Sequence, residues 1–192
     1  MIKAEDVVKN PYLIISVIGP HAGEGIAGIF LRKQQEIKNT GKSYWLIQSH
    51  KATTQQVQDL CKKAEARGYR AHCVFIEPTQ RGGARATSHS QAVKLSSSDN
   101  RKWENIPDGI KITGKISKNS TGLVFDVLEV FNPLASFDVW QYSEFGTKEP
   151  MKTMLGASTV CCERIYSPGM KKRYREIIGV GRLAPPYGLW LR

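Results

Sequence analysis

Apolar and polar residues alternate in blocks through the first 78 positions, and the blocks predict strands and helices in turn. The runs YLIISVIG (12–19) and AHCVFIEP (71–78) are continuously apolar, as in strands that are buried on both faces. SYWLIQS (43–49) is a third such run, rich in aromatic and aliphatic residues. The pattern therefore predicts a βαβαβ core over residues 12–78, in which these three segments are adjacent parallel strands covered by helices.

The two helices of this core have a predicted apolar face and predicted ends. On the first helix, residues at near-helical spacing form one face: Ile26, Ile29, Phe30, Lys33 and Ile37. Gly41 supplies its stop signal. The second helix, TQQVQDLCKKAEARG, can be capped by Thr53 or Thr54 and is followed by Gly68.

After residue 78 the periodicity is lost for about thirty positions. Residues 79–108 are rich in Gly, Ser, Arg and Asn and are predicted to form a long polar loop. GIKITGKI (109–116) and GLVFDVLEVF (122–131) are predicted to pair as an antiparallel hairpin that ends at Pro133.

The remaining segments are less regular. VWQYSEF and MLGASTVCCERIY fit either further strands or a short helix, and KKRYREIIGVG fits a short helix. The last stretch, RLAPPYGLWLR, contains adjacent prolines and is predicted to be an irregular basic tail. The fold class expected for the chain is α/β, with a Rossmann-like parallel sheet in the first half and the hairpin and tail in the second. Residues 1–192 are expected to form a single domain.

Positive charge is concentrated in two places. The chain has a net charge of +11. Residues 79–122 carry eight basic and three acidic side chains, and residues 164–192 carry seven and one. This distribution favours a polyanionic partner, a nucleic acid or a phosphorylated ligand, although a solvated basic surface is an alternative explanation.

Cysteine usage and hydropathy bear on the compartment. The four cysteines have no CxxC or zinc-type spacing, and the Cys161–Cys162 pair is expected to be buried in a strand. The chain has no run approaching 18 apolar residues, so we predict no membrane span and expect a cytoplasmic location. The histidines also lack metal-ligand spacing, and no metal site is predicted.

The most informative motif is VIGPHAGEGIAG (17–28), which joins the first strand to the first helix. Gly19, Gly23 and Gly25 have the GxxxGxG spacing, with the first glycine ending the strand and the last opening the helix. Glycines allow a tight turn without a Cβ, and the backbone N–H groups and helix dipole then face a bound phosphate. A bend that only packs helix on sheet would also need glycines.

Over residues 12–78 this arrangement resembles the nucleotide-binding start of the short-chain dehydrogenase/reductase family. In that family an acidic residue at the end of the second strand selects NAD. Here Ser49, His50 and Lys51 stand at that place, so the resemblance implies NADP or another nucleotide as ligand. His21, within the turn, is expected to face the same crevice. The family's YxxxK catalytic motif is absent, so whether the protein is an enzyme is left open.

Two further hypotheses concern other partners. Basic and aromatic residues are interleaved near the end of the chain, which is typical of nucleic-acid binding. The candidate residues for this alternative come from the polar loop and the tail: Arg81, Arg85, Lys171, Lys172, Arg173, Tyr174 and Arg175. A third hypothesis is a protein–protein interaction or accessory module without a small ligand.

Overall fold

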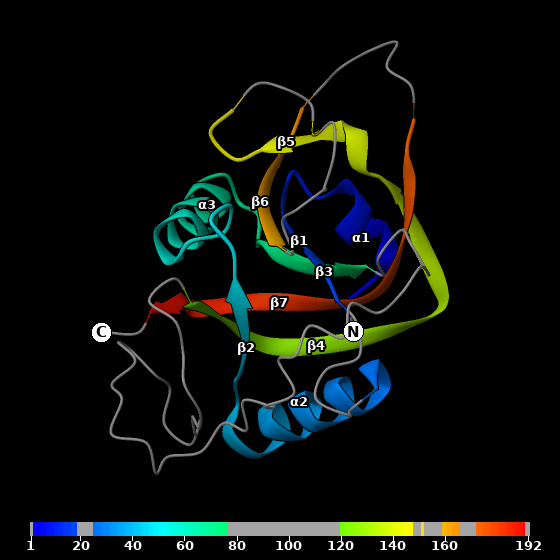
Figure 1. Cartoon of the computed structure of the whole chain (residues 1–192), viewed down its shortest axis with the longest axis vertical. Coiled ribbons are helices and arrows are strands. Elements are labelled where there is room, and N and C mark those ends of the chain that lie inside the picture. Colours follow the sequence, from blue (N-terminus) through cyan, green and yellow to red (C-terminus); the bar gives the residue numbers. More distant parts are fainter. Residues whose placement is uncertain are drawn as a thin grey trace.

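A computed structural model describes residues 2–18, 25–76, 120–147, 151, 159–165 and 172–190. Three α-helices, one short 3-10 helix and seven strands are found in these ranges (Figure 1). In chain order they are α1 (Ala4–Lys9), β1 (Tyr12–Val17), α2 (Ile26–Thr40), β2 (Ser43–Gln48), α3 (Thr54–Ala66), β3 (His72–Ile76), β4 (Ser120–Asp138), η1 (Val139–Gln141), β5 (Tyr142–Glu144), β6 (Thr159–Arg164) and β7 (Tyr174–Trp190).

All seven described strands belong to one mixed sheet, in the order β2-β4-β7-β3-β1-β6-β5. Only β1 and β3 are parallel neighbours; every other pair is antiparallel. The long strands β4 and β7 pair along most of their length, and both strands are bent (Figure 1). The α/β class is therefore confirmed, but the sheet is mostly antiparallel.

The predicted neighbours of the second strand are wrong. β2 lies at one edge of the sheet, where it pairs antiparallel with residues 120–125 of β4, and three strands separate it from β1. The apolar pattern of residues 43–49 correctly indicated a strand. A pattern of burial does not identify the strand that pairs with it, however, and here a segment more than seventy residues away does so.

The predicted helix and irregular tail near the end of the chain are also wrong. Residues 174–190 form one long strand, β7, which lies inside the sheet between β4 and β3. The prolines are accommodated because the pairing with β4 is interrupted there: Leu123 is opposite Gly188, whereas Phe125 is opposite Leu183. Residues 184–187, including Pro185 and Pro186, form a bulge, where a missing backbone N–H is tolerated.

The predicted hairpin is described only in its second half. Residues 122–131 lie within β4, and residues 109–116 lie outside the described ranges. Pro133 does not end the strand, which continues to Asp138 with a break in its pairing to β7 between Val130 and Ala135. Of the two undecided segments, the first contributes η1 and β5 and the second contributes β6.

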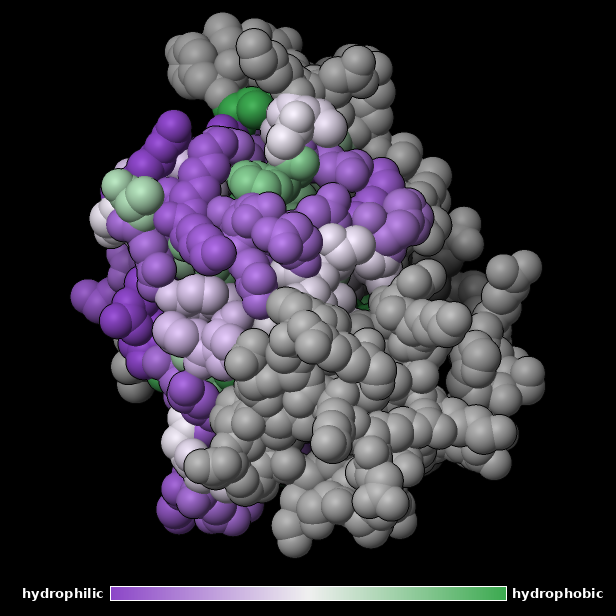
Figure 2. All heavy atoms as spheres, turned by 90° about the vertical axis from the view of Figure 1, so that its left-hand side faces the viewer, coloured by the Kyte–Doolittle hydropathy of each residue, from purple (hydrophilic) through white to green (hydrophobic). Residues whose placement is uncertain are grey.

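The helices begin and end at their predicted signals. Thr53 is the N-cap of α3 and forms a capping box with Gln56. Gly41 ends α2 in the left-handed conformation, with φ 79°. Lys62 and Glu65 are exposed residues of α3. α3 lies on the side of the molecule that Figure 2 shows, and the coloured part of that surface is mainly hydrophilic.

Each face of the sheet is covered by helices. On one face, α2 and α3 pack over a cluster that includes Tyr12 and Ile14 of β1. On the other, α1 packs over a cluster that includes Leu13 and Ile15. Alternate residues of β1 thus enter different cores, which explains why its sequence is a continuous apolar run.

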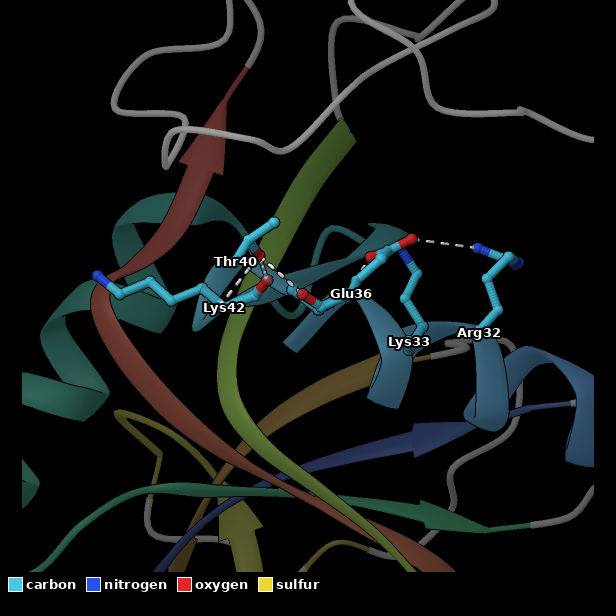
Figure 3. A network of polar contacts seen from close by, with 6 residues as sticks. Arg32, Lys33, Glu36, Thr40 and Lys42 are labelled. Carbon is cyan, nitrogen blue, oxygen red and sulfur yellow. Dashed lines mark hydrogen bonds and ion pairs between the residues drawn. The ribbon is translucent and has the colours of Figure 1, made fainter. Parts of the chain in front are cut away.

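A polar network joins α2 to β2 (Figure 3). The carboxylate of Glu36 accepts hydrogen bonds from Lys33 Nζ at 2.8 and 3.1 Å and from Ser43 Oγ at 2.5 Å. The Lys33 side chain is buried, and its ammonium group lies 4.7 Å from the centroid of the Tyr44 ring. Lys33 thus occupies the predicted buried face of the helix because its charge is paired there.

Two glycines of β7 make room for the aromatic core. A Cβ atom at Gly179 would lie 2.5 Å from the Phe30 ring, and one at Gly181 would lie 2.6 Å from the Phe125 ring. Both rings contact Phe75 edge to face, with centroids 5.3 and 6.0 Å apart. The rings therefore lie directly against the backbone of β7.

We predict that Gly181→Ala destabilises the protein by about 1–3 kcal/mol, because the new methyl group overlaps a ring that is packed on all sides. Thermal unfolding followed by circular dichroism measures this. Gly25→Ser is the matched control: nothing lies within 4 Å of that position, and its φ of −71° suits any residue. Equal melting temperatures for the two variants would contradict the role assigned to Gly181.

Candidate functional site

The parallel strands β1 and β3 end side by side, next to the glycine motif. Ile18 N donates to the Ile76 carbonyl at 2.9 Å just beyond the last paired residues. Residues 19–24 lie outside the described ranges, and the chain is described again from Gly25, the N-cap of α2. Gly25 has no side-chain cap, and the first turn of α2 contains no acidic residue. In sheets with parallel strands, ligands bind beyond such carboxyl ends.

A row of buried hydroxyl groups crosses this end of the sheet. Ser16 Oγ on β1 lies 2.9 Å from Thr159 Oγ1 on β6, and Ser49 Oγ donates to the Thr159 carbonyl at 2.5 Å. All three residues are at most 8% exposed. The hydrogen bonds therefore fix the turn that follows β2 against β6, the strand next to β1.

The same turn occupies the edge of β6 beyond the end of β5. Cys161 N donates to the Lys51 carbonyl at 2.9 Å, and the Cys161 carbonyl accepts from Phe145 N at 2.8 Å. Lys51 Nζ forms an ion pair with Glu144 Oε2 at 2.9 Å, and both side chains are about one-third exposed. Since β2 itself lies at the opposite edge of the sheet, residues 49–51 link the two sides of a strongly curved sheet.

The described residues of the predicted nucleotide site have different environments. Ser49 is buried and hydrogen-bonded, His50 is exposed, and Lys51 is paired with Glu144. Gly25 begins α2 as predicted. Gly19, His21 and Gly23 lie outside the described residues. Ser49–Lys51 thus approach the end of β1 through β6, and not through a neighbouring second strand as the family resemblance implies.

The predicted nucleic-acid residues are described only in part. Lys172, Arg173, Tyr174 and Arg175 lie at the start of β7, where residues 174–177 pair with residues 135–138 of β4. We call the segments 135–138 and 172–177 together the basic ribbon. Arg81, Arg85 and Lys171 lie outside the described ranges.

Sequence reasoning missed a polar cluster at the opposite end of β3. Asn10 Nδ2 donates to the Arg70 carbonyl at 2.6 Å and lies 2.9 Å from His72 Nδ1. On the neighbouring strands, Arg182 makes two hydrogen bonds to Asp126, of 2.8 and 3.1 Å. These residues come from four distant segments with no shared motif, so no sequence signal could have found the cluster.

The four cysteines are buried free thiols, as predicted for Cys161 and Cys162. Burial raises the pKa of each thiol, with smaller contributions from neighbouring groups. Because a thiolate is the reactive form, these cysteines are poor nucleophiles. Within the described ranges, no group of three His, Cys, Asp or Glu side chains could hold a metal ion. No described helix is long and apolar enough to cross a membrane.

Comparison with known proteins found no match: no family model, no curated protein and no solved structure is similar to the chain.

We predict that Ser49→Ala lowers the free energy of unfolding by about 1–2 kcal/mol, because the buried Thr159 carbonyl loses its hydroxyl donor. Chemical denaturation measures the change. His50→Ala is the control. The His50 side chain is exposed next to Ser49 in the chain, so its removal should leave stability nearly unchanged. A Ser49→Ala variant as stable as the control would show that this hydrogen bond does not hold the turn.

A second prediction concerns pH. Burial is the main cause that lowers the pKa of His72 from its ordinary value of 6.5, and the positive charge of Arg182 also lowers it, so the neutral ring is favoured. The stabilisation is complete above pH 6.5 and is lost as the pH falls toward the lower pKa of the folded protein. Denaturation curves should therefore show a loss of stability on acidification that is smaller in His72→Gln. His50→Gln, which changes an exposed histidine, is the matched substitution. If His72→Gln lost as much stability on acidification as His50→Gln and the parent do, this assignment would be refuted.

Proposed function

We propose that the protein binds a phosphate-bearing ligand, a nucleotide or dinucleotide, beyond the carboxyl ends of β1 and β3. The observation that supports this most is that the turn 49–51 meets the carboxyl end of β1, which is parallel to β3 and is followed in the chain by α2. Each of these belongs to a different segment of the chain. A site made from the ends of several elements is the usual arrangement for ligand binding in sheets with parallel strands.

The phosphate contacts are assigned to backbone groups. The glycine motif allows a ligand to approach the main chain, and the uncapped start of α2 carries the positive end of the helix dipole. Without an acidic side chain in the first turn, nothing in that turn repels an anion. Of the Rossmann-like arrangement expected for residues 12–78, the parallel pair of β1 and β3 and the helix α2 are the described elements that support this proposal.

Lys51 is assigned a role in selectivity. Its ammonium group forms an ion pair with the Glu144 carboxylate. To bind a 2′-phosphate, Lys51 would therefore have to exchange this carboxylate for the phosphate. The exposed His50 is the nearest neighbour in the chain that could add a second hydrogen bond. NADP is therefore the preferred ligand, although the energetic advantage over NAD is expected to be small.

We assign no reaction to this site. Burial keeps the described thiols protonated, which removes them as nucleophiles, and the described hydroxyls of Ser16, Ser49 and Thr159 are engaged in structural hydrogen bonds. The buried free thiols support a reducing compartment, in line with the expected cytoplasmic location.

The experiment is a titration of the full chain with NADP, NAD and ATP, followed by thermal shift and calorimetry. Gly25→Val should abolish binding of all three, because its side chain covers the backbone at the start of α2 while meeting open space in the fold. Lys51→Ala should weaken NADP binding about two- to fivefold and leave NAD binding unchanged. Lys62→Ala, on the outer surface of α3, is the matched control for loss of a cation.

The proposal fails if the parent protein shows no thermal shift with any of these nucleotides at millimolar concentration. It also fails if nucleotides bind equally well to Gly25→Val, since the ligand would then lie elsewhere.

A further inference from the structure

The basic ribbon extends beyond the rest of the sheet. β3 pairs with β7 only from Ile177 onward, and β2 pairs with β4 only as far as Phe125. Residues 136–138 and 174–176 therefore pair with each other, and neither segment has a second strand partner among the described residues. One edge of β7 pairs with β4 and the other faces β3. Because β3 ends its pairing at Ile177, the second edge has no strand partner at Tyr174–Glu176 among the described residues.

The side chains of the ribbon lie on both of its faces. Arg175 is opposite the buried Phe137 in the pairing with β4, so it is on the face that continues into the α1-side core. Tyr174 alternates with Arg175 and is on the outer face, and Lys172 and Arg173 directly precede the strand. The long basic side chains of Lys172, Arg173 and Arg175 can reach the same strand edge.

Arg173 and Arg175 are two residues apart and bring two positive charges to the start of β7. The pKa of Arg175 is lowered, mainly by partial burial and further by the positive charge of Arg173. Two cations held near each other favour the approach of a polyanion.

Asp138, which is opposite Tyr174 in the pairing of β4 with β7, is engaged by backbone N–H groups. Asp138 Oδ1 accepts backbone hydrogen bonds from Trp140 N at 3.1 Å and Arg173 N at 2.9 Å, and the residue is buried. Glu176 is exposed on the outer face and is the one acidic side chain of β7 within the ribbon.

A further cation lies beside η1, the turn that follows β4. The exposed Arg164, at the end of β6, donates to the Lys9 carbonyl at 3.2 Å and to the side chain of Gln141. Val139, in the same turn, donates to the Arg173 carbonyl at 3.0 Å. Cations from β6 and β7 are therefore held on either side of one short helix.

Tyr174 is the feature that indicates which polyanion fits. Its side chain is 59% exposed, among the most exposed of the large apolar residues, and it lies two residues after the exposed Lys172. An exposed ring beside cations is the arrangement that stacks on unpaired bases, whereas the bases of a duplex are already stacked on one another.

We propose that the basic ribbon binds single-stranded nucleic acid, with phosphates held by its cations and an unpaired base stacked on Tyr174. The nucleic acid runs along the edge of β7, beside Arg175 and the two cations, Lys172 and Arg173, that directly precede the strand. This site is separate from the nucleotide site proposed at the ends of β1 and β3, and it does not depend on it.

The test is a fluorescence anisotropy titration of the full chain with labelled oligothymidine and oligouridine of about 15 nucleotides and a duplex of equal length, at about 50 mM salt. Both single strands should bind more tightly than the duplex. Tyr174→Ala should weaken single-strand binding about tenfold, and Tyr174→Phe, which keeps the ring, should not. The double substitution Arg173→Ala and Arg175→Ala should weaken binding and flatten its dependence on salt.

Lys62→Ala is the control for nonspecific charge, and melting temperatures check that every variant is folded. A duplex that binds as tightly as the single strands overturns the proposal, as does a Tyr174→Ala variant with parental affinity or a parent that binds neither single strand. Gly25→Val should retain oligonucleotide binding, so that failure of the nucleotide site and failure of the ribbon are distinguished. Binding of an acidic polypeptide such as polyglutamate with equal affinity, insensitive to Tyr174→Ala, would also overturn it.

Discussion

The packing of aromatic rings on the bare backbone of β7 is the constraint on which the rest of the structure depends. Phe30 from α2 and Phe125 from β4 lie where Gly179 and Gly181 have no side chains, and both contact Phe75 of β3. One helix and three strands are thereby fixed relative to each other. The neighbouring Trp45 of β2 packs on the same group, with its ring 4.6 Å from that of Phe75, so the edge strand is held by the same interaction.

Local features of the sequence predicted where helices and strands form better than they predicted which strands pair with each other. The ends of α2 and α3 follow from Gly41 and Thr53, whose conformations and hydrogen bonds depend on a few adjacent residues. The apolar runs of β1 and β3 were also sufficient to predict their burial and their parallel pairing. The position of β2 was not predictable in this way, because it depends on β4, a strand far away in sequence. β7 was missed because glycines and prolines normally indicate irregular structure, whereas here they fit the aromatic core and a bulge.

The candidate site was predicted in part. The sequence placed the turn after β2 near the end of β1, and in the structure Ser49 of that turn is linked to Ser16 of β1 through Thr159. That a ligand binds there stays a prediction. The path by which the turn and β1 meet was different, since Ser49 reaches β1 through Thr159 of β6. The pairing of Lys51 with Glu144 could not be foreseen, because the two residues are 93 positions apart and carry no common pattern. That ion pair determines how much positive charge the turn can offer a ligand.

The interior position of β7 affects the order in which the chain can fold during synthesis. β3 and β4, the strands on either side of it, are complete on the ribosome before residues 174–190 have been made. Until then, β1 and β3 can pair with each other, and β2 can pair with β4, but the two parts of the sheet are not joined. The rings of Phe30 and Phe125 also lack the backbone of β7 against which they pack. Between the completion of β4 at residue 138 and the synthesis of β7, the nascent protein therefore exposes two unpaired strand edges and an apolar surface, features that favour aggregation until β7 covers them.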